Sequence, residues 1–263
     1  MLRVIVSAIT LAILASAGSA HYNMLLPSKP WAEKGEKVTF TYQFGHPFEH
    51  ELVDAPKPVA IRVFKPSGRT DEIDLVKVLS AIKKDGPDGK KVVTWQFDYS
   101  PSERGDFTFA LKTPVIKHGD DVAVEDIVRV VLHVQTQNGW DVPYRAFDAG
   151  LDLWPYTRPY GLLPGMVFKG RVVRLPFKDE FDMSDLNFVN GLQVEVEKYN
   201  PISPKKLPKD ELVTFKTKAD PYGFFVTTLP DSGWWGITAL THRGGKSKTI
   251  QRATLWVHVD EKK

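Results

Sequence analysis

The 263-residue sequence contains no cysteine. Disulfide bonds, thiolate metal sites and a lipid-anchored cysteine are therefore excluded, and any metal site must use imidazole, carboxylate, amide or the amine of the chain's own terminus. The sequence also lacks a large excess of positive or negative charge, because the formal net charge is only +3 and part of it lies in loops such as SPKKLPK. This balance gives no support to nucleic-acid binding.

Long apolar runs are missing after the first twenty residues. Residues 1–20 combine Arg3, an apolar stretch and a small-residue ending, which is typical of a cleaved secretory signal. The apolar stretch is shorter than the roughly 20 residues that span a bilayer. We therefore expect an exported, periplasmic protein with no membrane anchor of its own. Cleavage is expected after Ala20, with a cut after Ala17 as the alternative, since both sites satisfy the small-residue rule.

The common catalytic motifs are missing as well. The sequence has no glycine-rich phosphate loop, no Gly-x-Ser-x-Gly and no His-Glu-x-x-His. We therefore expect a binding protein and not an enzyme.

What the sequence does contain is alternation with a period of two. KVTFTYQF, VVTWQFDY, DFTFAL and DIVRVVLHVQ alternate in the first half, and six similar segments follow residue 166. This pattern predicts an all-β protein of two antiparallel β-sandwich domains, immunoglobulin-like or transthyretin-like, over residues 21–140 and 155–263. Residues 141–154 belong to a stretch rich in proline and glycine and are predicted to be a linker without regular structure. Little helix is expected beyond residues 70–84.

Metal-ligating residue types gather near the predicted mature terminus. If cleavage follows Ala20, His21 carries a free amine beside its imidazole, and the two nitrogens can chelate one ion. The segment GHPFEHE then offers His46, Glu49 and His50 at the end of a predicted strand. We expect His21 and His46 to lie close enough to share an ion, because they flank adjacent strands. The alternative interpretation is a polar loop after a strand, with His21 as an ordinary strand residue.

Two further histidines are weaker candidates. His133 shares a strand face with Arg129 and Val131, and that face either meets solvent or covers the partner domain. His242 follows the strand GWWGITAL, where it could serve as a ligand from the second domain.

Five segments give the sequence a family resemblance. AHYNMLLPS, TYQFGHPFEHE, TRPYGLLPGMVFKGRVV, LQVEVEKYNP and GFFVTTLPDSGWWGITAL resemble exported bacterial proteins associated with nickel and cobalt uptake, long catalogued as a domain of unknown function. These are similar to the periplasmic accessory component of energy-coupling-factor nickel transporters. The resemblance implies a mature N-terminal His21, a metal-binding first domain in which His46 and Glu49 match by position, and a second sandwich of the carboxypeptidase-regulatory or transthyretin type. His50 lies beyond the matched segment.

The expected function is capture of a divalent transition metal, nickel first and cobalt second, for delivery to a membrane transporter component. A nitrogen-rich site binds copper more tightly still, so a copper-handling protein is an alternative. The sequence is also compatible with a copper redox enzyme built on the N-terminal histidine, and with a structural envelope protein that binds no metal.

Overall fold

The computed structural model describes residues 21–118, 122–136, 138–142, 146–148, 150–175, 189–241 and 249–262. The predicted signal segment, residues 1–20, lies outside the described residues. The strands are β1 (Tyr22–Pro27), β2 (Trp31–Ala32), β3 (Val38–His46), β4 (Glu51–Val53), β5 (Ala60–Phe64), β6 (Thr70–Glu72), β7 (Ser80–Asp85), β8 (Lys91–Tyr99), β9 (Gly105–Lys112), β10 (Ile116–His118), β11 (Val122–Val134), β12 (Gly150–Pro155), β13 (Val167–Leu175), β14 (Gln193–Lys198), β15 (Thr214–Lys218), β16 (Phe224–Thr228), β17 (Gly233–Leu240) and β18 (Thr249–Val259). Helical turns are α1 (Leu75–Val78), η1 (Pro87–Gly89) and α3 (Asp210–Val213). The all-β prediction is confirmed.

The first sheet has the order β1-β3-β8-β7, with β4 paired to the far end of β3. The predicted alternation in β3 is confirmed, because Val38, Phe40, Tyr42 and Phe44 are all buried in the largest core cluster. β1 is buried along its whole length, which fits a strand covered on both faces.

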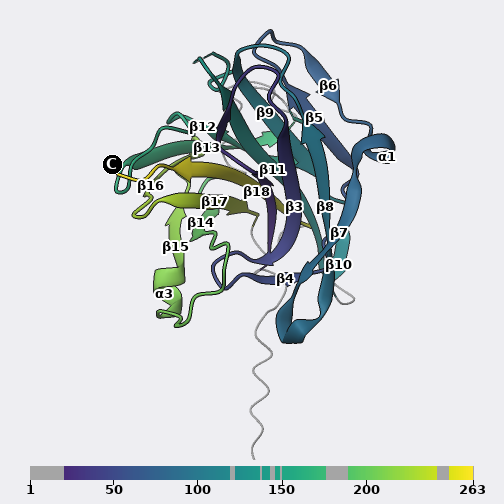
Figure 1. Cartoon of the computed structure of the whole chain (residues 1–263). Helices are drawn as coiled ribbons and strands as arrows, with labels where there is room; N and C mark the ends of the chain where they lie inside the picture. Colours follow the sequence, from purple (N-terminus) through teal and green to yellow (C-terminus); the bar gives the residue numbers. More distant parts are fainter. Residues whose placement is uncertain are drawn as a thin grey trace, which may run out of the picture.

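The second sheet runs through both halves of the chain, in the order β15-β14-β17-β18-β11-β9-β5-β6. Its centre is a parallel pair in which Ala123–Val130 of β11 lie beside Thr249–Trp256 of β18. Figure 1 shows β11 and β18 together at the middle of the molecule, between the early strands and the late ones. The sequence predicted antiparallel sandwiches, and this parallel pair is a feature that the alternation did not reveal.

The third sheet, β12-β13-β16, corrects the prediction of an irregular linker. Residues 150–155 form β12, which pairs with β13 along its entire length. Gly150 and Pro155 bound the strand, while Leu151 and Leu153 between them are buried in the second core cluster. Proline and glycine here mark the ends of a strand, and do not mark its absence.

The two halves also share their cores. Trp256 of β18 belongs to the cluster formed by the early strands, and its indole Nε1 donates a hydrogen bond to the Asn23 carbonyl of β1 at 3.0 Å. Within the described residues helix is confined to single turns, with α1 inside the predicted 70–84 region and α3 outside it. Among the described residues, no helix has the length and apolar character to cross a bilayer.

Candidate functional site

The placement of His21 follows from strand register. β1 and β3 pair antiparallel with Tyr22 opposite Gly45, so the next step along each strand puts His21 across from His46. Directly opposed residues of an antiparallel pair project from the same face. The two imidazole rings lie with centroids 4.5 Å apart at 67°, and the His21 ring also contacts Phe44. The expected proximity of His21 and His46 is confirmed.

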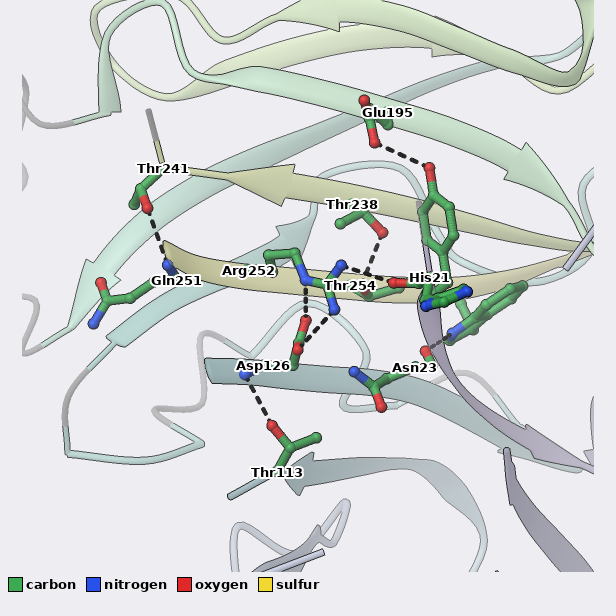
Figure 2. Close-up of polar contacts among 12 residues, drawn as sticks. His21, Asn23, Thr113, Asp126, Glu195, Thr238, Thr241, Gln251, Arg252 and Thr254 are labelled. Carbon is green, nitrogen blue, oxygen red and sulfur yellow. Dashed lines mark hydrogen bonds and ion pairs between the residues drawn. The ribbon is translucent and has the colours of Figure 1, made fainter. Parts of the chain in front are cut away.

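The backbone of His21 is held from β18. The Arg252 guanidinium donates to the His21 carbonyl at 2.7 Å while it binds both oxygens of Asp126 at 2.6 and 2.9 Å. Figure 2 shows Arg252 between Asp126 and His21, with the Asn23 segment alongside. The ion pair is almost fully buried. The start of β1 is therefore held in place by β11 and β18, the strand pair that joins the two halves of the molecule.

Gly45 allows the chain to fold back directly after this strand pairing. Its φ is +147°, and a Cβ at this position would lie 2.1 Å from the Glu51 carbonyl oxygen. Only glycine permits such a backbone approach. β4 can therefore return against the end of β3, and residues 47–50 form the turn between them.

This turn is anchored on the second half of the chain. The Phe48 amide donates to Glu197 Oε1 at 3.3 Å, the Asn200 side-chain amide donates to the Phe48 carbonyl at 2.7 Å, and the Asn200 backbone amide donates to Pro47 at 3.0 Å. Residues about 150 positions apart thus meet at one place. The segment GHPFEHE becomes part of an interface between β3–β4 and β14.

A cavity of about 300 Å³ opens at this interface. It is lined by Tyr22, His46, Glu49, Glu195, Glu197, Asp210, Val213, Thr214 and Lys216. Its walls come from β1, the β3–β4 turn, β14, α3 and β15. Four of the nine lining side chains are carboxylates, against a single lysine, so the cavity is acidic.

Glu197 is the most deeply placed of these carboxylates, at 3% exposed. It accepts hydrogen bonds from Phe48 N and from Thr214 Oγ1, the latter at 2.7 Å. Burial, together with the nearby charges of Glu49 and Glu195, nevertheless raises the pKa of its carboxyl to about 7. Glu49 Oε2 is buried and has no hydrogen-bond partner among the described residues. The negative charges of Glu49 and Glu197, which come from opposite halves of the chain, are therefore only partly compensated by hydrogen bonds.

Glu195 is better satisfied. Tyr22 donates its hydroxyl to Glu195 Oε2 at 3.1 Å, Gln193 donates to Oε1 at 2.6 Å, and Lys216 Nζ lies 3.3 Å from the same oxygen. Burial, with the charges of Glu197 and Glu195, raises the pKa of the Tyr22 hydroxyl well above its usual value, so Tyr22 remains a donor at neutral pH. Since Asp126 already neutralises Arg252, the cavity retains an excess of negative charge and suits a cation.

Side chains alone do not complete a metal site here. Within the ranges that the structure describes, no group of three or more His, Asp or Glu side chains is arranged to hold an ion. His21 and His46 give two imidazoles in contact. A free amine on His21 would give a third nitrogen donor on the same residue, which is the donor that a chain cleaved after Ala20 possesses.

The remaining sequence candidates lie elsewhere. His50 has a positive φ of 54°, and its ring packs 5.8 Å from that of Tyr199 instead of lining the acidic cavity. Burial lowers the pKa of the His50 imidazole, which keeps it neutral at pH 7. Its Nδ1 is buried and has no hydrogen-bond partner in the described part of the chain. His242 lies outside the described residues.

His133 belongs to a different neighbourhood. Its Nδ1 lies 2.7 Å from the buried carboxylate of Asp106, and its ring stacks on Tyr160 at 4.2 Å. Asp106 also accepts hydrogen bonds from Tyr160 and from two backbone amides. The face that His133 shares with Arg129 covers the other half of the chain, because Arg129 forms a buried ion pair with Asp152 of β12. The position fits a structural role for His133.

Glu195 and Glu197 were missed by sequence reasoning. The segment QVEVEK alternates valine with glutamate, which is typical of a strand with one solvent face. In the structure both faces are covered, since Glu195 is 8% and Glu197 3% exposed. No local signal distinguishes a covered acidic face from a solvated one.

Comparisons with known proteins give a family and distant structural similarity. The sequence model described as Domain of unknown function (DUF4198) matches residues 18–243. A comparison with curated protein sequences finds no match. Salmonella alpha-2-macroglobulin reacted with methylamine is 13% identical with a TM-score of 0.26, over 92% of this chain and 15% of that chain. The D0-D1 domain of intimin is 14% identical with a TM-score of 0.24, over 91% and 100%. This chain therefore spans about 15% of the macroglobulin, and such low scores carry no argument about function.

Proposed function

The chain belongs to the DUF4198 family, and from its acidic inter-strand cavity we propose that it is a periplasmic carrier that binds one divalent transition metal ion at His21. Nickel is the first candidate and cobalt the second. The carrier would release its ion to a membrane transporter component. The proposal includes cleavage after Ala20, since only then does His21 possess a free amine.

The observation that carries the proposal is the contact of the His21 and His46 imidazoles, with His46 lining an acidic cavity. Amine and imidazole from His21 with imidazole from His46 supply three nitrogen donors. The carboxylates of Glu49 and Glu197 lie on the same cavity and supply negative charge that the cationic side chains of the described residues do not fully balance. A divalent ion would stabilise that charge. Glu49 is the better candidate for a fourth ligand, because one of its carboxylate oxygens has no hydrogen-bond partner among the described residues.

Copper is a second candidate within the same class. Three nitrogen donors in a tetragonal arrangement suit Cu²⁺ as well as Ni²⁺, and copper forms the tighter complex at a given set of ligands. The contact between His21 and His46 favours this candidate as strongly as it favours nickel. Peroxide-driven turnover of a polysaccharide by the copper-loaded protein would assign the copper redox enzyme instead of a carrier. A structural envelope protein predicts no stoichiometric metal.

The direct test is elemental analysis of the protein purified from the periplasm with its native N-terminus. About one nickel, cobalt or copper ion per chain is expected. A chain that starts at His21 by intact mass, yet contains no transition metal and binds none on titration, would contradict the proposal. The identity of the bound element distinguishes the nickel carrier from the copper alternative.

Glu197→Gln provides a sharper test, because the substitution should stabilise the metal-free protein. The pKa of Glu197 is 4.5 in the unfolded chain and about 7 in the folded one. Between those values the folded state holds a proton that the unfolded state has released, so the free energy of unfolding falls as pH rises. Glutamine keeps both hydrogen bonds, with its oxygen accepting from Phe48 N and its amide donating to Thr214. We expect the metal-free variant to be more stable by about 2–3 kcal/mol at pH 8 and unchanged near pH 4.

Addition of Ni²⁺ should reduce this difference in stability. The ion compensates the charge of Glu197 in the wild type, so its midpoint of thermal unfolding should rise more than that of Glu197→Gln. Glu33→Gln, which removes an exposed carboxylate that does not line the cavity, is the matched control and should behave like the wild type. If Ni²⁺ raises the midpoint of thermal unfolding equally in the wild type and in Glu197→Gln, then Glu197 does not contribute to the metal site.

A further inference from the structure

The segment that runs from the end of β14 into α3 carries an unusual combination of exposed side chains. Ile202, Leu207 and Leu212 are 78%, 51% and 60% exposed. Lys205, Lys206 and Lys209 stand between them, and all three are exposed. Isolated exposed apolar residues are ordinary, but three of them within eleven residues, interspersed with three exposed lysines, give this segment an amphipathic character. We call residues 201–212 the lysine loop.

The backbone of the lysine loop is conformationally restricted. Pro201, Pro204 and Pro208 restrict its backbone, which reduces the conformational entropy that would be lost on binding. Val213, immediately after it, is buried and anchors α3 to the body of the protein. Figure 1 shows α3 and the loop that leads into it at the lower end of the molecule, beneath β15. The lysine loop therefore lies at the periphery of the molecule, where its exposed side chains can contact another surface.

The edge of the sheet beside the loop extends its positive charge. β15 is the terminal strand of the ten-stranded sheet, and Lys216 and Lys218 are exposed along it. Residues 201–218 thus contain five lysines and two carboxylates. One of these carboxylates, Asp210, and one of the lysines, Lys216, line the acidic cavity, which leaves four lysines and Glu211 outside it. The outer surface of the segment is therefore cationic, although the protein as a whole is nearly neutral.

We propose that the lysine loop docks the protein on an anionic membrane surface, with Ile202 and Leu207 entering the headgroup region and the lysines contacting lipid phosphates. Exposed apolar side chains flanked by lysines match the chemistry of an anionic bilayer surface on both counts. Asp210, Thr214 and Lys216 border the acidic cavity, so docking turns its rim toward the membrane. The orientation of the cavity rim has a functional meaning only if the protein is the proposed metal carrier, whereas docking itself does not depend on that function.

The test is sedimentation of the full mature chain with vesicles, in the presence of a chelator so that metal binding plays no part. We expect at least about 10-fold stronger association with vesicles of 30% phosphatidylglycerol in phosphatidylcholine than with pure phosphatidylcholine, and a marked loss at high salt. Lys205→Gln/Lys206→Gln/Lys209→Gln should lower association with the anionic vesicles about 10-fold or more. Ile202→Ser/Leu207→Ser should weaken association even at low salt.

The matched control removes the same charge elsewhere. Lys34, Lys83 and Lys90 are exposed on different loops and strands, and their replacement by glutamine should change association by no more than about two-fold. All substituted residues are exposed, and thermal unfolding verifies that each variant is folded. Absence of binding to either vesicle, or equal losses in the loop and control variants, would overturn the proposal. Retention on native membranes but not on protein-free vesicles would also overturn it, by indicating a protein partner.

Discussion

A mature chain that carries one additional glycine ahead of His21 is expected to bind Ni²⁺ or Cu²⁺ about 100-fold more weakly, or worse, than the chain that begins at His21. The extra residue converts the His21 amine into an amide and moves the free amine away. The close spacing of amine and imidazole that allows chelation by one residue is then lost. Loss of one orienting group around a metal already lowers affinity by about 10–100-fold, and loss of a direct ligand should cost at least as much.

The fold should confine the effect of the extra glycine to the position of the amine. Arg252 fixes the His21 carbonyl, and the register of β1 against β3 keeps the His21 ring beside His46 with or without the extra glycine. The imidazoles should therefore stay in place while only the amine is displaced. Isothermal titration of both chains with nickel and with copper measures the difference. Thermal unfolding of the two metal-free chains, expected to be equal, serves as the control.

The same experiment bears on the choice between the two cleavage sites. A cut after Ala17 leaves Gly18, Ser19 and Ala20 ahead of His21 and removes the chelate in the same way. Intact mass of the exported protein identifies the natural terminus. If that terminus is His21 and the glycine-extended chain binds metal with unchanged affinity, then His21 contributes at most its ring.

The contact between His21 and His46 could be predicted from the sequence because it depends on local patterns. Alternation identified β3, the segment HYNMLLPS was expected to be the strand next to it, and two strands joined by a short connection pair antiparallel. The end of one then faces the start of the other. The prediction did not need any knowledge of the second half of the chain.

The acidic wall of the same site could not be predicted this way. The turn at Pro47 and Phe48 contacts Glu197, and Tyr22 of β1 contacts Glu195, so both carboxylates meet segments about 150 or more residues away in the sequence. The parallel pairing of β11 with β18 is equally distant in sequence. A strand of alternating valine and glutamate is compatible with solvent or with cover, and the partner that decides between them has no signature within the strand itself.

Removal of the Arg252 side chain should have the largest effect on stability. Arg252→Met leaves the Asp126 carboxylate, which is 1% exposed, without its bidentate partner. A buried carboxylate deprived of its cation typically costs about 3–5 kcal/mol. For a protein of this size we expect the midpoint of thermal unfolding to fall by roughly 10 °C or more. Since the pair joins β11 to β18, the strands shared by both halves, the loss should appear in a single transition.

Two companion variants separate the charge from the packing. Arg252→Met/Asp126→Leu removes both charges and replaces them with apolar side chains, so most of the stability should return, because the penalty arises from the unpaired carboxylate and not from the absence of the ion pair. Lys91→Met breaks the exposed ion pair with Asp85 and should change stability by less than about 1 kcal/mol. Similar unfolding midpoints for Arg252→Met and Lys91→Met would show that the buried pair does not hold the two halves together. If the double variant recovers stability but still binds nickel weakly, the contact of Arg252 with the His21 carbonyl positions the metal site independently of its role in the fold.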